Sequence, residues 1–172
     1  MALILSGING IAQNKRNWAI LPEVGGRLRL PNQPIFYAFK PVVVGGGGVT
    51  GAGARFTFDT TRINIGNHFN TETHRFTAPI NGVYEFHAEG LFRFQGSNSP
   101  AEFSFFVNGG NVNNRGMVYS RMSGTSAHTP CHTVLMTQLY AGDAVDVRVV
   151  DATTNDFYVS ENLAYFCGKL IG

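Results

Sequence analysis

The sequence has few charged residues, few cysteines and no obvious targeting segment. Asp, Glu, Lys and Arg together make up 14% of its 172 residues, and the formal net charge is +2. A net charge this small gives no basis for nucleic-acid binding. The first five residues are apolar, but no basic residue precedes them, so they predict neither a signal peptide nor a membrane span. We therefore expect a protein that is made in the cytoplasm and does not insert into a membrane.

The sequence also lacks the apolar repeat of about 3.6 residues that helices show. It is instead rich in Gly (21 residues) and Phe (14 residues), which is typical of a turn-rich β protein. After Gly82 the side chains alternate: Tyr84 and Phe86 fall on one face, and Glu85 and His87 on the other. This pattern predicts a central strand with an aromatic inner face. We expect β segments at about residues 34–40, 55–58, 62–65, 74–78, 82–94, 101–108, 111–120, 128–140, 143–151 and 157–171.

Residues around this strand follow the order aromatic, Asn, aromatic, Phe and then Gly-x-Tyr-x-Phe. They are Phe58, Asn64, Phe69, Phe76, Gly82, Tyr84 and Phe86. The pattern resembles the C1q-domain signature, although Ala88 stands where another aromatic is expected. The opening segment 33–36, the turn with Gly142 and Asp143, and the closing segment with Phe166 and Gly168 also resemble this family. The resemblance implies an all-β antiparallel jelly-roll sandwich of the C1q/TNF type over residues 33–172, assembled as a homotrimer.

The two cysteines, Cys131 and Cys167, are too few for a disulfide framework. In a C1q-like arrangement their strands would flank a common neighbour, which places them about two strand spacings, or ~9–10 Å, apart. That separation exceeds the reach of a disulfide. We therefore expect two free thiols in the core.

Residues 1–32 form a segment of a different kind, with no sustained period and with several Gly and Pro residues. Residues 1–55 hold six basic residues and one acidic residue, so a basic arm precedes a mildly acidic body. The arm carries too many apolar side chains to leave in water, and we expect it to pack on a neighbouring subunit or a larger assembly. The alternative is that it packs on its own domain. Because Trp and Arg are common interface anchors, we predict Arg16, Trp18 and Leu21 as the anchor.

No catalytic or cofactor motif is convincing. The glycine-rich segment 42–53 formally contains Gly-x-Gly-x-x-Gly, but a strand pattern follows it where a phosphate site needs a helix. Glu85 and Glu89 lie on the outer face of one strand without a nucleophile motif nearby, so we interpret them as solvated charges. We expect no enzyme activity and no cofactor.

Metal sites are also weakly supported. His128, Cys131 and His132 are zinc-type ligands, but on a strand positions 128 and 132 lie about 13 Å apart, and 131 and 132 point to opposite faces. Three copies of His87 on a three-fold axis are a further option, which we rank below a hydrogen-bonded structural role. Asp151 and Asp156 lack the dense oxygen ligands of a calcium site.

The trimer-forming resemblance, the arm and the missing export pattern together favour a non-enzymatic virion structural protein. The specific hypothesis is a homotrimeric decoration (cement) protein of a bacteriophage head, with the major capsid protein or another virion protein as partner. One alternative is a tail or head fibre knob that binds a host-surface receptor or glycan through loops 95–100 and 121–129. Another is a free bacterial C1q-like ligand-binding module. At the trimer seam we predict Phe36, Tyr84 and Tyr165.

Overall fold

The structure is a computed structural model. The structure describes residues 21–22, 28–29, 33–41, 48–49, 51–93, 101–112, 118–120, 128–152, 156–158 and 164–172. The chain divides into two compact units, Met1–Gln33 and Pro34–Gly172. In the first unit, β1 (Leu21–Pro22) and β2 (Leu28–Arg29) form an antiparallel pair.

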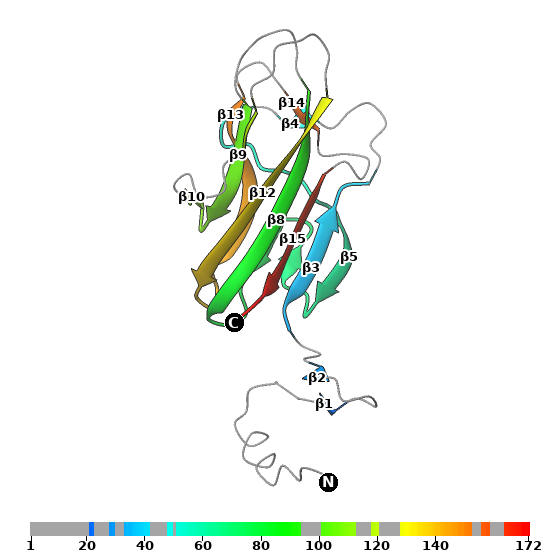
Figure 1. Cartoon of the computed structure of the whole chain (residues 1–172), viewed down its shortest axis with the longest axis vertical. Coiled ribbons are helices and arrows are strands. Elements are labelled where there is room, and N and C mark those ends of the chain that lie inside the picture. Colours follow the sequence, from blue (N-terminus) through cyan, green and yellow to red (C-terminus); the bar gives the residue numbers. More distant parts are fainter. Residues whose placement is uncertain are drawn as a thin grey trace. The chain divides into compact units, whose positions relative to one another are not determined.

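The second unit consists of two antiparallel sheets (Figure 1). The larger sheet contains, in spatial order, β5 (Thr60–Ile65), β3 (Ile35–Phe39), β15 (Tyr165–Leu170), β8 (Gly82–Arg93) and β12 (His128–Leu139). The end of β8 also pairs with β14 (Asp156–Tyr158), which in turn pairs with β4 (Gly48–Val49). The smaller sheet contains β6 (Phe69–Asn70), β7 (Arg75–Thr77), β13 (Ala144–Ala152) and β9 (Ala101–Val107), with β10 (Gly110–Asn111) and β11 (Val118–Ser120) both paired with β9. The described part of the chain contains no helix. The predicted all-β jelly roll is confirmed.

Strand β8 is the centre of the larger sheet, as its alternating sequence predicts. Its pairing with β12 runs without a shift from Gly82 opposite Leu139 to Arg93 opposite His128. Its other edge pairs with β15 and then with β14. Tyr84 is fully buried, and the intervening Glu85 is only partly covered. The two faces predicted from the sequence are therefore the two faces of this sheet.

Several strand boundaries differ from the prediction. Residues 55–58 form only an isolated bridge, Arg55 with Arg148, although Phe56 and Phe58 are completely buried. In the expected segment 111–120 the structure describes the end of β10 and β11, and in 157–171 it describes β14 and β15, while residues 113–117 and 159–163 lie outside the described residues. The apolar pattern reports which side chains are buried, and burial does not require a continuous ladder of backbone hydrogen bonds.

Aromatic rings fill the space between the sheets. The largest fully buried side chains are Tyr84, Phe36, Phe56, Phe58, Phe76, Phe86, Phe103, Phe105 and Phe166. The Phe166 ring makes an edge contact with Phe36, with centroids 4.8 Å apart. Phe166 also lies opposite Ala88 in the sheet, so its ring occupies the region where the C1q signature has an aromatic at position 88. Each buried Phe contributes roughly 2–3 kcal/mol, so this cluster accounts for much of the stability.

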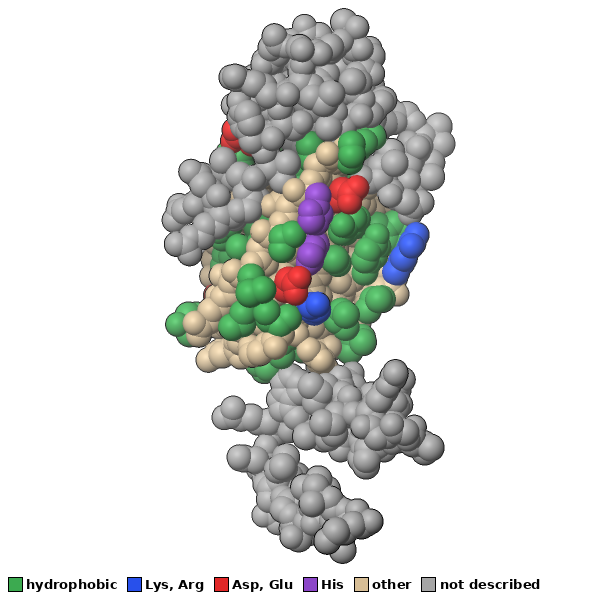
Figure 2. All heavy atoms as spheres, viewed as in Figure 1, with side chains coloured by type: hydrophobic (Ala, Val, Ile, Leu, Met, Phe, Trp, Pro, Cys, Tyr) green, Lys and Arg blue, Asp and Glu red, His purple; other side chains and the backbone are tan. Residues whose placement is uncertain are grey.

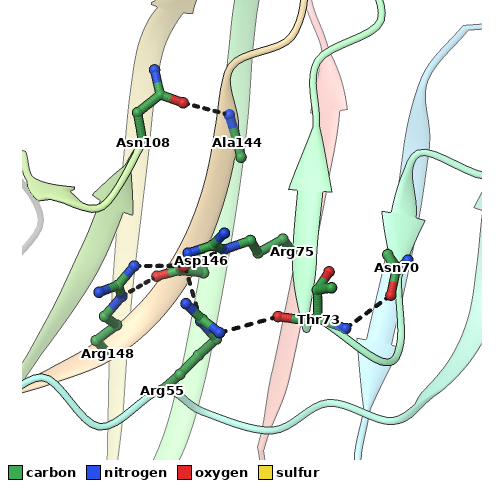
Figure 3. Close-up of polar contacts among 8 residues, drawn as sticks. All are labelled: Arg55, Asn70, Thr73, Arg75, Asn108, Ala144, Asp146 and Arg148. Carbon is green, nitrogen blue, oxygen red and sulfur yellow. Dashed lines mark hydrogen bonds and ion pairs between the residues drawn. The ribbon is translucent and has the colours of Figure 1, made fainter.

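The smaller sheet carries an ionic cluster on its outer side (Figure 3). Asp146 is 2% exposed, and its carboxylate accepts hydrogen bonds from Arg55 at 3.0 Å, from Arg75 at 2.9 Å and from Arg148 at 2.6 Å. Arg55 also donates to the carbonyl oxygen of Thr73 at 3.4 Å. The carboxylate therefore ties the irregular segment at residue 55 to β7 and β13.

Candidate binding face of the larger sheet

The outer face of the larger sheet is the most distinctive surface that the structure describes. Because side chains alternate in direction along a strand, every second residue of β3, β8, β12 and β15 points away from the aromatic core. Figure 2 shows histidine, acidic and lysine side chains running through the middle of this face, with hydrophobic side chains on both sides. The face thus combines a polar strip with two apolar margins.

The polar strip is a chain of contacts across β12, β8 and β15. Nδ1 of His87 lies 3.4 Å from Nε2 of His132. Nε2 of His87 lies 2.7 Å from a carboxylate oxygen of Glu85, whose other oxygen lies 3.4 Å from Nζ of Lys169. The hydrogen bond with His87, and then that with Lys169, lower the pKa of Glu85. Glu85 is therefore an engaged anion and not the solvated charge predicted from the sequence.

The apolar margins lie on β12 and on the β3–β5 side. Val134 and Met136 of β12 are 43% and 63% exposed, and Ile63 and Ile65 of β5 are 44% and 41% exposed. Soluble monomers rarely expose large apolar side chains together, and where they do, the patch often marks a binding surface.

A pocket of about 370 Å³ lies on the β3–β5 side of the face. Its walls include Ile35, Tyr37, Ile63, Tyr165 and Cys167. The rings of Tyr37 and Tyr165 stack with centroids 5.4 Å apart. Burial and the nearby charge of Glu89 raise the pKa of Tyr165 to about 12. Glu85, His87 and Lys169 of the polar strip also line this pocket, so its walls are partly apolar and partly charged.

The three residues predicted at a trimer seam divide between core and surface. Phe36 and Tyr84 are 1% and 0% exposed and lie among the core rings, where the Tyr84 hydroxyl donates to the carbonyl oxygen of Ile80 at 2.9 Å. Their own chain covers both side chains, so they have a core role and not the predicted seam role. Tyr165 lies on the open face. The sequence shows that aromatic residues share a face, but not which face the second sheet covers.

Of the predicted arm anchors, Arg16 and Trp18 lie outside the described residues. Leu21 begins β1, and its side chain is also outside the described set. The anchor remains a prediction. The glycine-rich residues 42–47 and most of the two candidate receptor loops likewise lie outside the described residues.

The family-signature residues shape the core and its turns. Phe58, Phe69, Phe76, Phe86 and Phe166 are buried. The Asn64 amide donates to the carbonyl oxygen of Phe69 at 2.9 Å, and Asn64 Oδ1 accepts from the Phe69 amide at 3.1 Å. This two-point contact closes the turn between β5 and β6.

The turn before β13 depends on Gly142 and Asp143. Gly142 has a φ of 96°, a conformation that side chains disfavour. Asp143 accepts from the Asn108 amide and from the backbone amide of Tyr140, both at 2.7 Å, and these bonds lower its pKa. Gly82 meets a different need, because a Cβ there would lie 2.9 Å from the carbonyl oxygen of Gly172.

Neither cysteine forms a disulfide, as predicted, but only Cys131 is buried in the core, whereas Cys167 is half-buried and lines the pocket on the outer face. Cys131 and Cys167 lie on β12 and β15, the two strands that flank β8. Burial raises the pKa of the Cys167 thiol. Cys131 is buried and the neighbouring His132 is exposed, so they point to opposite faces of β12, as the sequence predicts.

No group of three or more His, Cys, Asp or Glu side chains among the described residues is placed to hold a metal ion. Asp151 and Asp156 belong to β13 and β14, but their side chains are not among those described. The His87–His132 contact was missed in the sequence because it depends on the register of β8 with β12. The signal that could have found it is the pairing of two histidine-bearing strands around the predicted centre.

The described residues form a two-sheet jelly roll with a mixed polar and apolar outer face. Residues 48–171 match the C1q domain family, and the chain belongs to this family. Domains of this kind form homotrimers, bind ligands and are generally not enzymes. No described helix is both long and apolar enough to cross a membrane.

The fold is shared with solved structures at low sequence identity. The globular domain of zebrafish complement 1qA aligns with a TM-score of 0.59 and 17% identity, covering 81% of this chain and 98% of that one. Murine APRIL aligns with a TM-score of 0.58 and 12% identity, covering 81% of this chain and 99% of that one. The Eiger TNF of S. frugiperda aligns with a TM-score of 0.60 and 10% identity, covering 82% of this chain and 94% of that one. No curated protein matches the chain in sequence.

Proposed function

We propose that the protein is a non-enzymatic assembly module that works as a homotrimer through the outer face of its larger sheet. The observation that carries the proposal is the exposure of Val134 and Met136 on one margin of this face and of Ile63 and Ile65 on the other. Burying such side chains contributes roughly 25 cal/mol per Å² of apolar surface. Since C1q-type domains form homotrimers, further copies of the chain are the occupants that fit.

The two margins suit a head-to-tail contact. The protruding Met136 margin of one copy packs against the pocket beside Ile63 and Tyr165 on the next. Such heterologous contacts generate a closed ring when the rotation between copies permits, and three contacts close a trimer. The polar strip with Glu85 and Lys169 then lies between copies and restricts their orientation, because misaligned charges would be left without partners.

Within this class we propose a role in a virion: a decoration protein of a bacteriophage head, with residues 1–32 as the anchor on the major capsid protein or another virion protein. Supporting features are the many apolar side chains of this segment, its excess of basic over acidic residues and its division from the body as the compact unit Met1–Gln33. A protein that binds only the assembled shell stabilises it by mass action. Trp18 would supply the largest single anchor.

The test compares the full-length protein with a version lacking residues 1–32. The solution mass of each is measured, and each is then mixed with naked capsids made from the major capsid protein of the same genome. We expect trimers in both cases, and capsid binding with a raised capsid melting temperature for the full-length protein alone.

Three other results would overturn parts of the proposal. If both versions trimerise, neither binds capsids and both bind host cells or sugars, the protein is a fibre knob. If the shortened version stays soluble and binds a free ligand as well as the full-length protein does, it is a ligand-binding module. If both are monomers, the shared premise of a homotrimer is wrong.

A further inference from the structure

Two histidines on neighbouring strands meet at the centre of the polar strip. On β8 and β12, His87 lies opposite Val134 and His132 lies opposite Glu89, so the two histidines are diagonal neighbours across an antiparallel pair. Side chains in diagonal positions are close enough to touch when they are long. Here Nδ1 of His87 and Nε2 of His132 are 3.4 Å apart. Both strands are twelve residues long and pair in an unbroken register, which determines the relative positions of the two histidines.

The hydrogen bond to Glu85 determines which nitrogen of His87 is free. The N–H group at Nε2 of His87 donates a hydrogen bond to the Glu85 carboxylate at 2.7 Å. A neutral imidazole carries one proton, so Nδ1 of His87 presents a lone pair toward His132. When the proton of His132 is on Nδ1, its Nε2 also presents a lone pair to the same space. In that tautomer neither nitrogen donates to the other, and a cation that replaces the hydrogen bond between the two rings can bind both nitrogens.

The spacing of the two nitrogens fits a metal ion. Imidazole nitrogens bind zinc at about 2.0–2.1 Å, and a tetrahedral angle then places two of them roughly 3.3–3.4 Å apart. The observed distance is 3.4 Å. Metal-bound histidines usually donate their second ring nitrogen to a carboxylate, which orients the ring and increases its basicity. Glu85 occupies that position for His87.

The surroundings also favour a cation. Glu85 contacts His87 directly, and Glu89 lies opposite His132 in the sheet. The positive charge nearby is Lys169, whose Nζ lies on the far oxygen of Glu85, 3.4 Å away. In a single copy the side chain of His87 is 34% exposed and that of His132 is exposed, so an ion can reach both rings before copies associate.

We propose that His87 and His132 bind a divalent transition-metal ion of the zinc class, one ion per chain, with water in the remaining positions. Imidazole pairs suit Zn²⁺, Cu²⁺, Ni²⁺ and Co²⁺, whereas Ca²⁺ and Mg²⁺ prefer oxygen ligands. Both protein ligands come from one chain, so the site does not depend on the proposed trimer.

The test is calorimetric titration of the untagged full-length protein with Zn²⁺, supported by the absorption spectrum of Co²⁺. We expect one ion per chain and a loss of affinity of at least tenfold in His87→Gln and in His132→Gln. Glu85→Gln should keep the stoichiometry and lower the affinity about tenfold or more, since it removes the orienting carboxylate. Zn²⁺ should also shift the NMR signals of Nδ1 in His87 and Nε2 in His132.

Two matched controls are available. His68→Gln removes a histidine between β5 and β6 that lies outside the pair, and Cys167→Ser removes a nearby thiol. Both should bind as the wild type does. The proposal is wrong if the wild type binds no ion, if His87→Gln binds as tightly as the wild type, or if Cys167→Ser loses the ion. A monomeric variant that still binds one ion per chain would separate this result from failure of the proposed trimer.

Discussion

Gly168 of β15 lies directly opposite Phe86 of β8, and a Cβ atom at position 168 would overlap the Phe86 ring. The same Cβ would also lie 2.9 Å from Cε1 of Phe36. The glycine of the closing strand is therefore required by the packing of rings on its two neighbouring strands. Its φ is not in the left-handed region, so backbone freedom is not the reason.

Gly168→Ala should destabilise the domain by about 1–3 kcal/mol, because the added methyl group overpacks a rigid aromatic cluster. Denaturant unfolding measures the effect as a lower midpoint. Gly172→Ala is the matched control, since a Cβ there meets no atom within 4 Å and should change stability by less than about 0.5 kcal/mol. Equal midpoints for the two variants would contradict this account of Gly168.

Asp146→Asn should lower the free energy of unfolding at neutral pH by about 3 kcal/mol, because three arginines lose the charge that they surround. Unfolding in urea at pH 7 measures the loss. The exposed Asp59, whose carboxylate accepts a hydrogen bond only from the adjacent Thr60 among the contacts described, provides the control variant Asp59→Asn. A change of similar size in both variants would show that Asp146 has no special role.

The contribution of Asp146 should also depend on pH. Burial alone would raise its pKa, but the hydrogen bonds from Arg148 and Arg75 and the charge of Arg55 outweigh burial, and the pKa lies below its ordinary value of 3.8. The unfolded chain therefore takes up the proton first as the pH falls, and stability present above pH 3.8 is lost progressively below it. The difference in free energy of unfolding between wild type and Asp146→Asn should become smaller below pH 3.8. A difference that does not change with pH would contradict a lowered pKa of Asp146.

Met136→Asp should weaken self-association by at least tenfold, because it places a charge on the margin proposed to be buried between copies. Sedimentation velocity measures the shift from trimer to monomer. Thr77→Asp places the same charge on an exposed position of the smaller sheet and should remain trimeric. If Met136→Asp forms trimers as stable as those of the wild type, β12 does not form part of the contact between copies.

Tyr165 should lose its proton about two pH units above an ordinary tyrosine, at about 12, because burial and Glu89 disfavour its anion. A raised pKa means that the folded state holds the proton longer, so stability is complete below about pH 10 and falls as the pH rises through 12. Absorbance titration of the phenols should show that Tyr165→Phe loses the late step. Glu89→Gln should move that step to lower pH, and an unchanged step would contradict the role of Glu89.

The central strand could be predicted closely from sequence because alternation is a local property. The expected segment 82–94 and the observed Gly82–Arg93 differ by one residue, and the inward direction of Tyr84 and Phe86 follows from period two. Which side chains lie on the outer face of the larger sheet could not be predicted in the same way. Ile35 and Tyr37 are large side chains with mostly apolar surface, as Phe36 is, so only the position of the second sheet decides which of them is covered.

Contacts between distant parts of the chain were also beyond the sequence. Arg55 and Asp146 are separated by 91 positions, and His87 and His132 by 45. Their meeting depends on strand register, which is determined by the whole sheet and by its turns. The residue types were visible in the sequence, but the partners were not.

Strand β12 has β8 as its one partner among the described strands, and this leaves twelve residues of backbone along a sheet edge. The edge of a sheet is a template for aberrant pairing with other chains. Pro130 removes one donor near the start of the strand, but the following residues lack this protection. In the proposed trimer the neighbouring copy shields this edge, so assembly would also protect newly made chains against aggregation.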